Sequence, residues 1–503
     1  MAHRVFITLM LAALTAAAQS DRGTITGQIL DGTGAAVPNA QVTAVNSATQ
    51  VRYQTASNDT GTYVIPQLPS GEYEVTVQAA GFRRTTQRGI TIAVLQTVNL
   101  NVTLELGEVE QTIDVVADAP AVETATSDLG TTVSKDQVVD LPLAVSGNMR
   151  HPGAFVFLAP GVTGDTSNTQ INGSQSRSKE ILLDGIGSVS PESGGLLFTY
   201  PSVEAINEFK LVAANFSSEY GRTGGGFEVY TTKSGTNQMH GGAFNYLRND
   251  QFDARGFFAN TRAINRQNEY GAFLGGPVVL PKIYNGTNRT FFHFVWSGFR
   301  FRQGELNQLL TLPTVGMRAG DFSGVNRLVY DPTTTRQDGA GNFIRDPFPQ
   351  NRIPVNRFSR VSANSLQYIP GVSNPNLTLN YQAVGARTFD RDQYNVKFDH
   401  NFSDKQRFNI YIYQNSQVET APEQIAGALS PSRTTERPGL WIRLNHDSVI
   451  TPTMINNFRA GFTREPERFR RITADQDWPN KIGLTGVNTG PGNVFPRVTF
   501  TMA

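Results

Sequence analysis

The sequence predicts a mainly β protein in three successive parts: a small β-sandwich, a mixed α+β segment, and a series of amphipathic strands that cross a membrane. Three observations predict this. Charged residues make up only 17% of the 503 residues, while Gly, Phe and Tyr number 47, 31 and 15. Short alternating runs between turn residues indicate strands. After the N-terminus no run approaches ~18 apolar residues, so a membrane would be crossed by strands.

The first segment, residues 1–18, has the pattern of a cleaved secretory signal peptide. His3 and Arg4 precede an apolar run that starts at Val5 and closes on small residues at Ala18. The alternative is an N-terminal anchor, but roughly 14 apolar residues are fewer than the ~20 that a spanning helix needs. We therefore expect export and cleavage after Ala18.

Residues 23–106 predict a small β-sandwich. Every second residue from Val98 to Leu106 is apolar, and the alternation of Tyr73, Val75 and Val77 follows a turn. The runs GQILDGTGAAVPNAQVTAVN and NDTGTYVIPQLPSGEYEVTVQAAGF closely resemble the carboxypeptidase regulatory-like domain, a prealbumin-like sandwich. That resemblance does not imply peptidase activity, because the module accompanies catalytic domains without being one.

Residues 107–238 mix short strands, helical turns and glycine-rich loops. Residues 203–212 begin as a helical turn and continue as a strand, and Tyr220–Gly226 leads into a strand at Phe227–Thr232. Nucleotide-binding loops run from a strand into a helix, so this reversed order argues against nucleotide binding.

The same segment resembles the plug domain of TonB-dependent receptors, in which a Leu-Asp-Gly turn precedes a helix-to-strand element and a closing Thr-Lys-Ser-Gly-Thr. Within that family the chain is most similar to the Oar-like subgroup. The motifs that carry the resemblance are Leu183–Gly185, Thr232–Thr236, Asp140–Leu143, Ile171–Ser178, Ser218–Arg222 and Phe244–Asp250.

Residues 239–503 predict a transmembrane antiparallel β-barrel. Tyr394–Phe402 alternates strictly, turns at Ser403–Gln406 and resumes at Phe408, Ile410 and Ile412. Phe292, Phe294 and Trp296 form another apolar face, as do Phe458, Ala460 and Phe462. A charge facing lipid at the bilayer midplane costs about 2–4 kcal/mol, so we expect Lys397, Asp399 and Arg459 in the lumen.

The resemblance implies a barrel of 22 strands, of which this chain holds only a part. About eight strands fit the residues after the plug at roughly 20 residues per strand and turn. We interpret the chain as truncated at its C-terminus, and we expect that this stretch alone does not insert as a monomer, since lipid excludes open sheet edges.

A long aperiodic stretch at about 303–391, rich in Pro, Gly and Asn, interrupts the strands. Long loops of such barrels face outward, so we expect this one to be extracellular and to help admit the ligand. A disordered excursion is the alternative.

The plug resemblance implies transport driven by a TonB-type protein of the inner membrane, which binds a short box by strand addition. The alternative interpretation of this segment is an eighth sandwich strand, and Asp114 departs from the aliphatic residue more usual in such a box. The candidate box consists of Glu110, Gln111, Thr112, Ile113, Asp114, Val115, Val116 and Ala117.

Four plug residues are candidates for a functional role: Arg177, Asp184, Arg222 and Lys233. Internal packing of plug against barrel is the alternative for each. We expect no catalytic residues, no cofactor and no metal site, because nucleophile motifs are absent and the six His lie without metal-ligand spacing.

The predicted function is therefore transport of a bulky solute across the outer membrane, by uptake or export, the solute being a siderophore, an oligosaccharide or a peptide. Its partners are a TonB-type protein and outer-membrane lipid. Nucleic acid is not expected, because the net charge is only +1. The alternative is an adhesin whose sandwich binds carbohydrate or protein.

Overall fold

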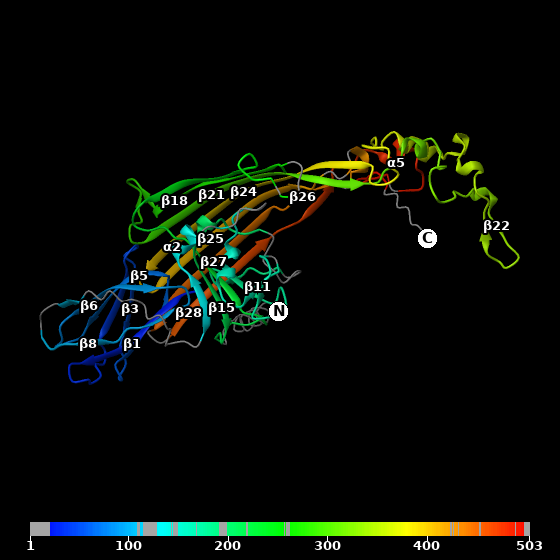
Figure 1. Cartoon of the computed structure of the whole chain (residues 1–503). Coiled ribbons are helices and arrows are strands. Elements are labelled where there is room, and N and C mark those ends of the chain that lie inside the picture. The colour runs from blue at the N-terminus through cyan, green and yellow to red at the C-terminus, as the bar shows by residue number, and fades with distance from the viewer. Residues whose placement is uncertain are drawn as a thin grey trace, which may run out of the picture.

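The computed structural model describes residues 21–107, 111–113, 128–141, 143, 149–166, 168–190, 199–217, 220–255, 257, 262–422, 425, 427–430, 432–451, 454–487 and 489–496. The signal peptide predicted at 1–18 lies outside this range. The molecule has three bodies: a sandwich, a plug and a curved sheet (Figure 1). The sandwich lies at one end, the plug lies against the sheet, and an irregular region lies at the far end of that sheet. Among the described residues, none of the helices has the length and hydropathy to cross a membrane.

The sandwich has two sheets that enclose one apolar core, as the alternation of its strands predicted. Tyr63, Tyr73, Val75 and Ile92 are among its fully buried residues. One sheet has the order β4-β1-β7, with β8 also on β1, and the other has the order β3-β2-β5-β6-β9. The strands are β1 (Gly23–Asp31), β2 (Gln41–Asn46), β3 (Arg52–Ala56), β4 (Thr62–Leu68), β5 (Gly71–Gln78), β6 (Thr85–Ile92), β7 (Thr97–Asn99), β8 (Val102–Leu104) and β9 (Gln111–Ile113).

The last sandwich strand differs from the prediction, because 98–106 is divided into β7 and β8. Both segments pair with β1 in one register, but the Asn101 side chain accepts the Gln28 backbone N–H at 2.8 Å and so replaces a ladder bond. The Leu100 carbonyl accepts the Tyr63 hydroxyl at 2.7 Å. Leu106, predicted to face the core, is exposed because it lies beyond the end of β8.

The plug is built on a five-stranded sheet of order β10-β15-β16-β13-β14. A helical turn, η2, passes into β15, and β16 starts directly after the glycine-rich loop, as predicted. Phe209, Leu211 and Val229 are fully buried on this sheet. The elements are β10 (Leu129–Val133), α2 (Lys135–Asp140), η1 (Pro152–Leu158), β11 (Val162–Thr163), β12 (Gln170–Ile171), β13 (Glu180–Leu183), β14 (Ile186–Gly187), η2 (Val203–Ala205), β15 (Ile206–Ala214) and β16 (Phe227–Thr232).

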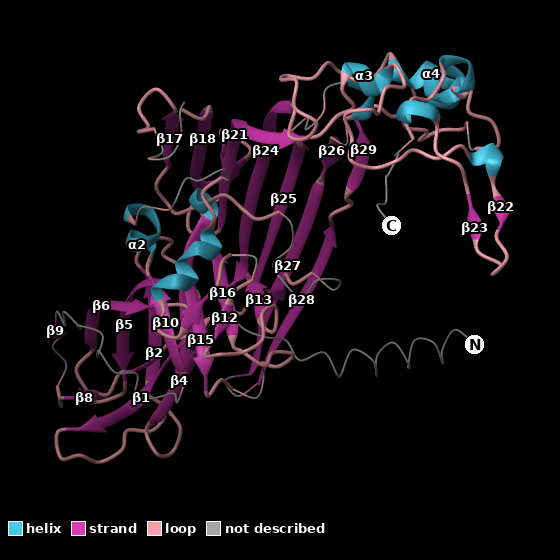
Figure 2. Ribbon diagram, turned by 45° about the vertical axis from the view of Figure 1, so that its right-hand side comes forward, coloured by secondary structure: helices cyan, strands magenta, loops and turns pink. Residues whose placement is uncertain are grey.

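The third body is an antiparallel sheet that curves around the plug (Figure 2). In the described part of the chain it has nine strands, of which β26 and β27 both pair with β25, and β29 and β28 pair with them in turn. β26 and β27 thus occupy one strand position of the sheet, and β28 and β29 occupy the next. The nine segments therefore fill seven strand positions, where we expected about eight strands. The strands are β17 (His240–Asn249), β18 (Asn265–Pro277), β21 (Thr290–Leu310), β24 (Tyr381–Ser403), β25 (Gln406–Thr420), β26 (Arg433–Glu436), β27 (Gly439–Thr451), β28 (Met454–Arg464) and β29 (Arg468–Arg471).

The predicted hairpin is present, since Ser403 on β24 pairs with Gln406 on β25. The predicted faces are also present. The Lys397 ammonium, which we expected in the lumen, is buried and donates to the plug carbonyl of Thr232 at 3.1 Å. Phe458 and Phe462 are about half exposed on the opposite face, where lipid would lie.

The long loop is shorter and more structured than predicted. Residues 303–310 continue β21 and residues 381–391 belong to β24, so the loop proper is 311–380. At this end of β21 and β24 the outward positions hold ion pairs, Arg300 with Asp392 and Arg302 with Asp390, in place of apolar residues. The alternation of apolar and polar residues that predicts a strand is therefore lost. Its elements are α3 (Val315–Arg318), η3 (Pro332–Thr334), β22 (Arg336–Gln337), β23 (Phe343–Ile344), η4 (Pro349–Asn351), η5 (Val355–Arg357) and α4 (Arg360–Leu366).

This loop packs on a second irregular segment near the C-terminus. Trp478 lies edge-on to Tyr368 and to Phe495, with ring centroids 5.1 and 5.4 Å apart. Helices α3 and α4 gather at the end of the sheet away from the sandwich (Figure 2). The remaining short elements are β19 (Val279–Leu280), β20 (Tyr284–Asn285), η6 (Gly427–Leu429) and α5 (Trp478–Ile482).

Candidate functional site

The candidate box lies partly in the described range. Gln111–Ile113 form β9, which pairs in parallel with Thr85–Gln87 at the edge of β6. Glu110 and residues 114–117 lie outside the described residues. For these three residues the structure therefore has the alternative arrangement, an added sandwich strand, while the role of the segment as a box stays a prediction.

Asp184 connects the plug to the barrel wall. It occupies the β13–β14 turn with φ 48°, followed by Gly185 with φ 74°, and a left-handed pair of this kind favours Asp-Gly in a tight hairpin. Its carboxylate accepts the Thr232 backbone N–H at 2.9 Å and lies 3.6 Å from the Lys397 ammonium on β24. Asp184 is only 2% exposed, so this pair is shielded from water.

Lys233 also lies between plug and barrel. Its ammonium is 4.0 Å from the Glu204 carboxylate and 6.0 Å from the ring centroid of Phe273 on β18. Burial lowers the pKa of Lys233, and the nearby Glu204 carboxylate opposes that shift. The alternative role, internal packing of the plug against the barrel, thus fits both Asp184 and Lys233.

Arg177 and Arg222 differ from these two residues, because both are exposed and both have left-handed backbone, with φ 67° and 59°. Burial raises the pKa of Glu180, and the positive charge of Arg222 opposes that shift. The structure therefore brings Asp184 and Lys233 to the barrel wall and leaves the two arginines on the plug surface.

A buried ion-pair cluster was not predicted from the sequence. The Arg150 guanidinium is 3.0 Å from Glu204 in the plug and 2.9 Å from Glu269 on β18. It also lies 3.9 Å from the ring centroid of Tyr246 on β17. Burial alone would lower the pKa of Arg150, but the two carboxylates raise it. The available signal was Glu269, a charge at an inward position of an alternating strand.

A second cluster was also missed. Arg391 on β24 is fully buried and donates to the plug carbonyl of Tyr200 at 2.6 Å and to the Tyr413 hydroxyl at 2.7 Å. On β27, Arg443 donates to the Ser188 hydroxyl at 3.2 Å. Both arginines occupy inward positions of alternating strands, a pattern that indicates lumen-facing charge but does not identify the plug partner.

The sandwich contacts both other bodies. The Val94 backbone N–H donates to the Glu208 carboxylate of the plug at 2.9 Å, and Asn207 donates to the Ser70 hydroxyl at 2.9 Å. The Arg407 guanidinium, beside the β24–β25 turn, lies 3.8 Å from the ring centroid of Tyr53. The sandwich thus covers the end of the plug that lies away from the long loop.

The described residues contain no group of three His, Asp or Glu side chains that would hold a metal ion. What the site offers is mechanical. A domain lies against the inner face of the curved sheet, and buried hydrogen bonds and ion pairs hold it there at several separate points.

Comparison with known proteins gives the class. Residues 231–503 match the family model of the outer membrane beta barrel domain, and residues 24–105 match that of the carboxypeptidase regulatory-like domain. The TonB-dependent transporter Oar of Myxococcus xanthus is 25% identical over 281 residues, which are 53% of this chain and 26% of Oar. This chain therefore spans about a quarter of the length of that relative.

Two solved structures overlap partially with the chain. The outer membrane transporter YddB of Escherichia coli shares 12% identity at a TM-score of 0.41, over 68% of this chain and 40% of YddB. A variant of the ferric enterobactin receptor of Pseudomonas aeruginosa, in complex with enterobactin, shares 12% identity at a TM-score of 0.35, over 70% of this chain and 43% of the receptor.

The chain is an outer-membrane β-barrel protein, as the match over more than half of its length shows. Its N-terminal part matches the carboxypeptidase regulatory-like domain, and over 53% of its length the chain is similar to a TonB-dependent transporter, Oar.

Proposed function

We propose that the protein moves a bulky solute through its barrel with energy from the inner membrane. The observation that carries this proposal is the plug, which lies against the inner wall and is held there by buried polar contacts from Asp184, Arg150 and Arg391. A solute passes only when some of these contacts break. Since the outer membrane has no energy source of its own, that work comes from a TonB-type partner.

We further propose that residues 110–117 receive the partner. Strand addition uses backbone hydrogen bonds, so it requires an extended segment with free backbone groups. The position between sandwich and plug and the extended conformation of β9 support this proposal. Because β9 is paired with β6, the segment has to leave that edge before a partner strand takes its place.

The test compares a deletion of 110–117 with two substitutions at one position. Thr112→Pro removes a backbone donor, whereas Thr112→Val keeps it. We expect the deletion and Thr112→Pro to abolish cross-linking to the TonB-type protein and the accumulation of solute that depends on the proton-motive force. Thr112→Val should retain both. Unchanged energised transport in the deletion would reject the proposal.

The solute is a siderophore, an oligosaccharide or a peptide, and 311–380 is an extracellular loop that helps to admit it. Asp184 and Lys233 hold the plug to the wall. Arg177 and Arg222 remain candidates for contact with solute or partner, because their side chains are exposed on the plug. Carbohydrate binding by the sandwich is a separate proposal, tested by adding oligosaccharides to the protein and measuring binding heat.

A further inference from the structure

Two arginines face each other near the outer end of the barrel wall. Arg433 on β26 is directly opposite Arg471 on β29, and the next pair on the same face is Thr435 with Phe469. Residues directly opposite in an antiparallel pair project to the same face. Thr435 is in turn opposite Glu419 on β25, whose inward positions include the buried Asn415. Arg433, Phe469 and Arg471 therefore project to the same face of the sheet as the buried Asn415.

The charges next to this pair neutralise one another. The Glu419 carboxylate is 2.7 Å from Arg387 on β24 and 3.5 Å from Arg437. Arg437 also donates to the Glu467 carboxylate at 2.6 Å. In the described part of the wall, these two carboxylates are thus already paired with Arg387 and Arg437.

Arg433 and Arg471 have no such partner. Among the described residues, no carboxylate forms an ion pair with either guanidinium, and Arg433 instead lies 4.4 Å from the ring centroid of Phe469. Like charges directly opposite on one face of a sheet destabilise the pair. A bound anion would remove that repulsion, and guanidinium groups bind oxyanions in a bidentate manner.

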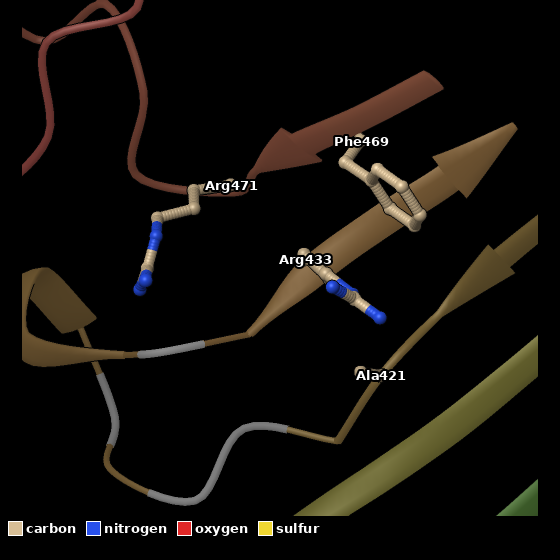
Figure 3. A pocket seen from close by; sticks show the side chains of 4 residues that line it. All are labelled: Ala421, Arg433, Phe469 and Arg471. Carbon is tan, nitrogen blue, oxygen red and sulfur yellow. The ribbon is translucent and has the colours of Figure 1, made fainter. Parts of the chain in front are cut away.

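The two arginines line a cavity. Ala421, Arg433, Phe469 and Arg471 surround a volume of about 480 Å³ (Figure 3), within the range of pockets that hold small ligands. In the close-up Arg433 lies beside the Phe469 ring, whereas the Arg471 guanidinium lies apart and points away from that ring (Figure 3).

We propose that this cavity binds an oxyanion, a phosphate or carboxylate group of a soluble ligand, between Arg433 and Arg471, with Phe469 against its apolar part. A lipid phosphate is the other source of the same chemistry. Its place would be the opposite face of β29, where Arg468 and Arg470 point outward and already have carboxylate neighbours, Glu436 at 4.0 Å and Asp475 at 3.1 Å.

The test is calorimetric titration of the full-length protein in nonionic detergent with inorganic pyrophosphate, and in a second arm with vesicles that contain an anionic lipid. We expect pyrophosphate to bind and its affinity to fall as NaCl is raised. Arg433→Gln and Arg471→Gln should each weaken binding by about tenfold or more, because each removes a charged hydrogen-bond donor. Arg433→Lys should retain part of the affinity.

The matched control is the double variant Arg468→Gln with Arg470→Gln, which removes two positive charges from the outer face of β29, one more than either single variant removes. It should bind pyrophosphate like the parent protein. Equal affinity after loss of Arg433 and Arg471, equal loss in the control, binding to the vesicles alone, or no binding of pyrophosphate by the parent protein would each overturn the proposal.

The role of this cavity as a first contact for a transported solute rests on the proposed function, but oxyanion binding does not. Binding is measured without a TonB-type partner, so the deletion of 110–117 should leave it unchanged. A negative titration would leave the transport proposal standing, and continued energised transport after that deletion would leave the oxyanion site standing.

Discussion

Gly27 lies on β1 opposite the break between β7 and β8, where a Cβ would clash with the Leu100 carbonyl oxygen. Because that obstacle is backbone, Gly27→Ala should destabilise the sandwich by about 1–3 kcal/mol, the usual cost of overpacking. Hydrogen exchange of the β1 amides in the intact protein measures the change. Gly32→Ala is the control, since nothing lies within 4 Å of a Cβ there. Equal exchange in the two variants would contradict the prediction.

His151 should make the plug sensitive to acid. Its Nδ1 accepts the Gly153 backbone N–H at 2.8 Å, and its ring lies 3.8 Å from that of Tyr200. Burial, followed by the charges of Arg391 and Lys179, lowers the pKa of His151 to about 3 from 6.5. Between these values the unfolded chain binds a proton that the folded plug does not, so stability falls as the pH falls below 6.5.

The ring of His151 is partly exposed, so we expect a loss of about 1 kcal/mol between pH 7 and pH 5, measured as faster proteolysis of the plug. His151→Asn preserves an acceptor at this helix cap and removes the titrating group. The acid sensitivity should therefore decrease in that variant. The same pH dependence in parent and variant would assign the effect to another group.

At the scale of the elements, the buried ion pairs of Arg150 with Glu204 and Glu269 join the plug to β18. Glu269→Gln removes a carboxylate from Arg150 and leaves a buried guanidinium with Glu204 as its ion-pair partner. Loss of one partner of a buried pair costs about 3–5 kcal/mol, so plug release in urea should need markedly less denaturant.

The control for this element is the half-exposed pair of Arg300 with Asp392, whose closest atoms are 2.8 Å apart. Asp392→Asn should change the urea midpoint by no more than the ~1 kcal/mol typical of surface pairs. If both variants shift that midpoint equally, burial of the Arg150 cluster does not determine the stability of the plug.

The elements that the sequence predicted well have one strong local signal. The hairpin turn at Ser403–Gln406 and the start of β16 at Phe227 follow from alternation and from glycine. The break at Asn101 was missed, because a side chain that replaces a backbone bond does not change the apolar pattern. The partners of Arg150 and Arg391 were missed because contacts between distant segments have no local signal.

At the scale of the whole molecule, β21 and β24 continue well past the apolar face that begins at Phe292. From Arg300 outward their exposed faces have ion pairs, and eleven residues at ~3.4 Å each extend the strand by roughly 35 Å. A transmembrane strand needs only ~9–11 residues. The loop 311–380 is therefore expected well outside the bilayer.

Because the chain has no Cys, single cysteines report the orientation without background. Gly339 lies at an exposed loop tip, and Asp404 lies in the β24–β25 turn beside the sandwich. The two test variants are Gly339→Cys and Asp404→Cys. A membrane-impermeant maleimide should label the first in intact cells and the second only after permeabilisation. The reverse pattern would invert the proposed orientation.

The pairing of β9 with β6 has a mechanical consequence. Among the described residues three pairs hold this strand, and each backbone hydrogen bond contributes about 0.5–1.5 kcal/mol net. Tension applied to the segment would break these pairs one after another, at low force. The connection between the sandwich and the plug would then lengthen first. The plug would bear the load only once this connection was fully extended.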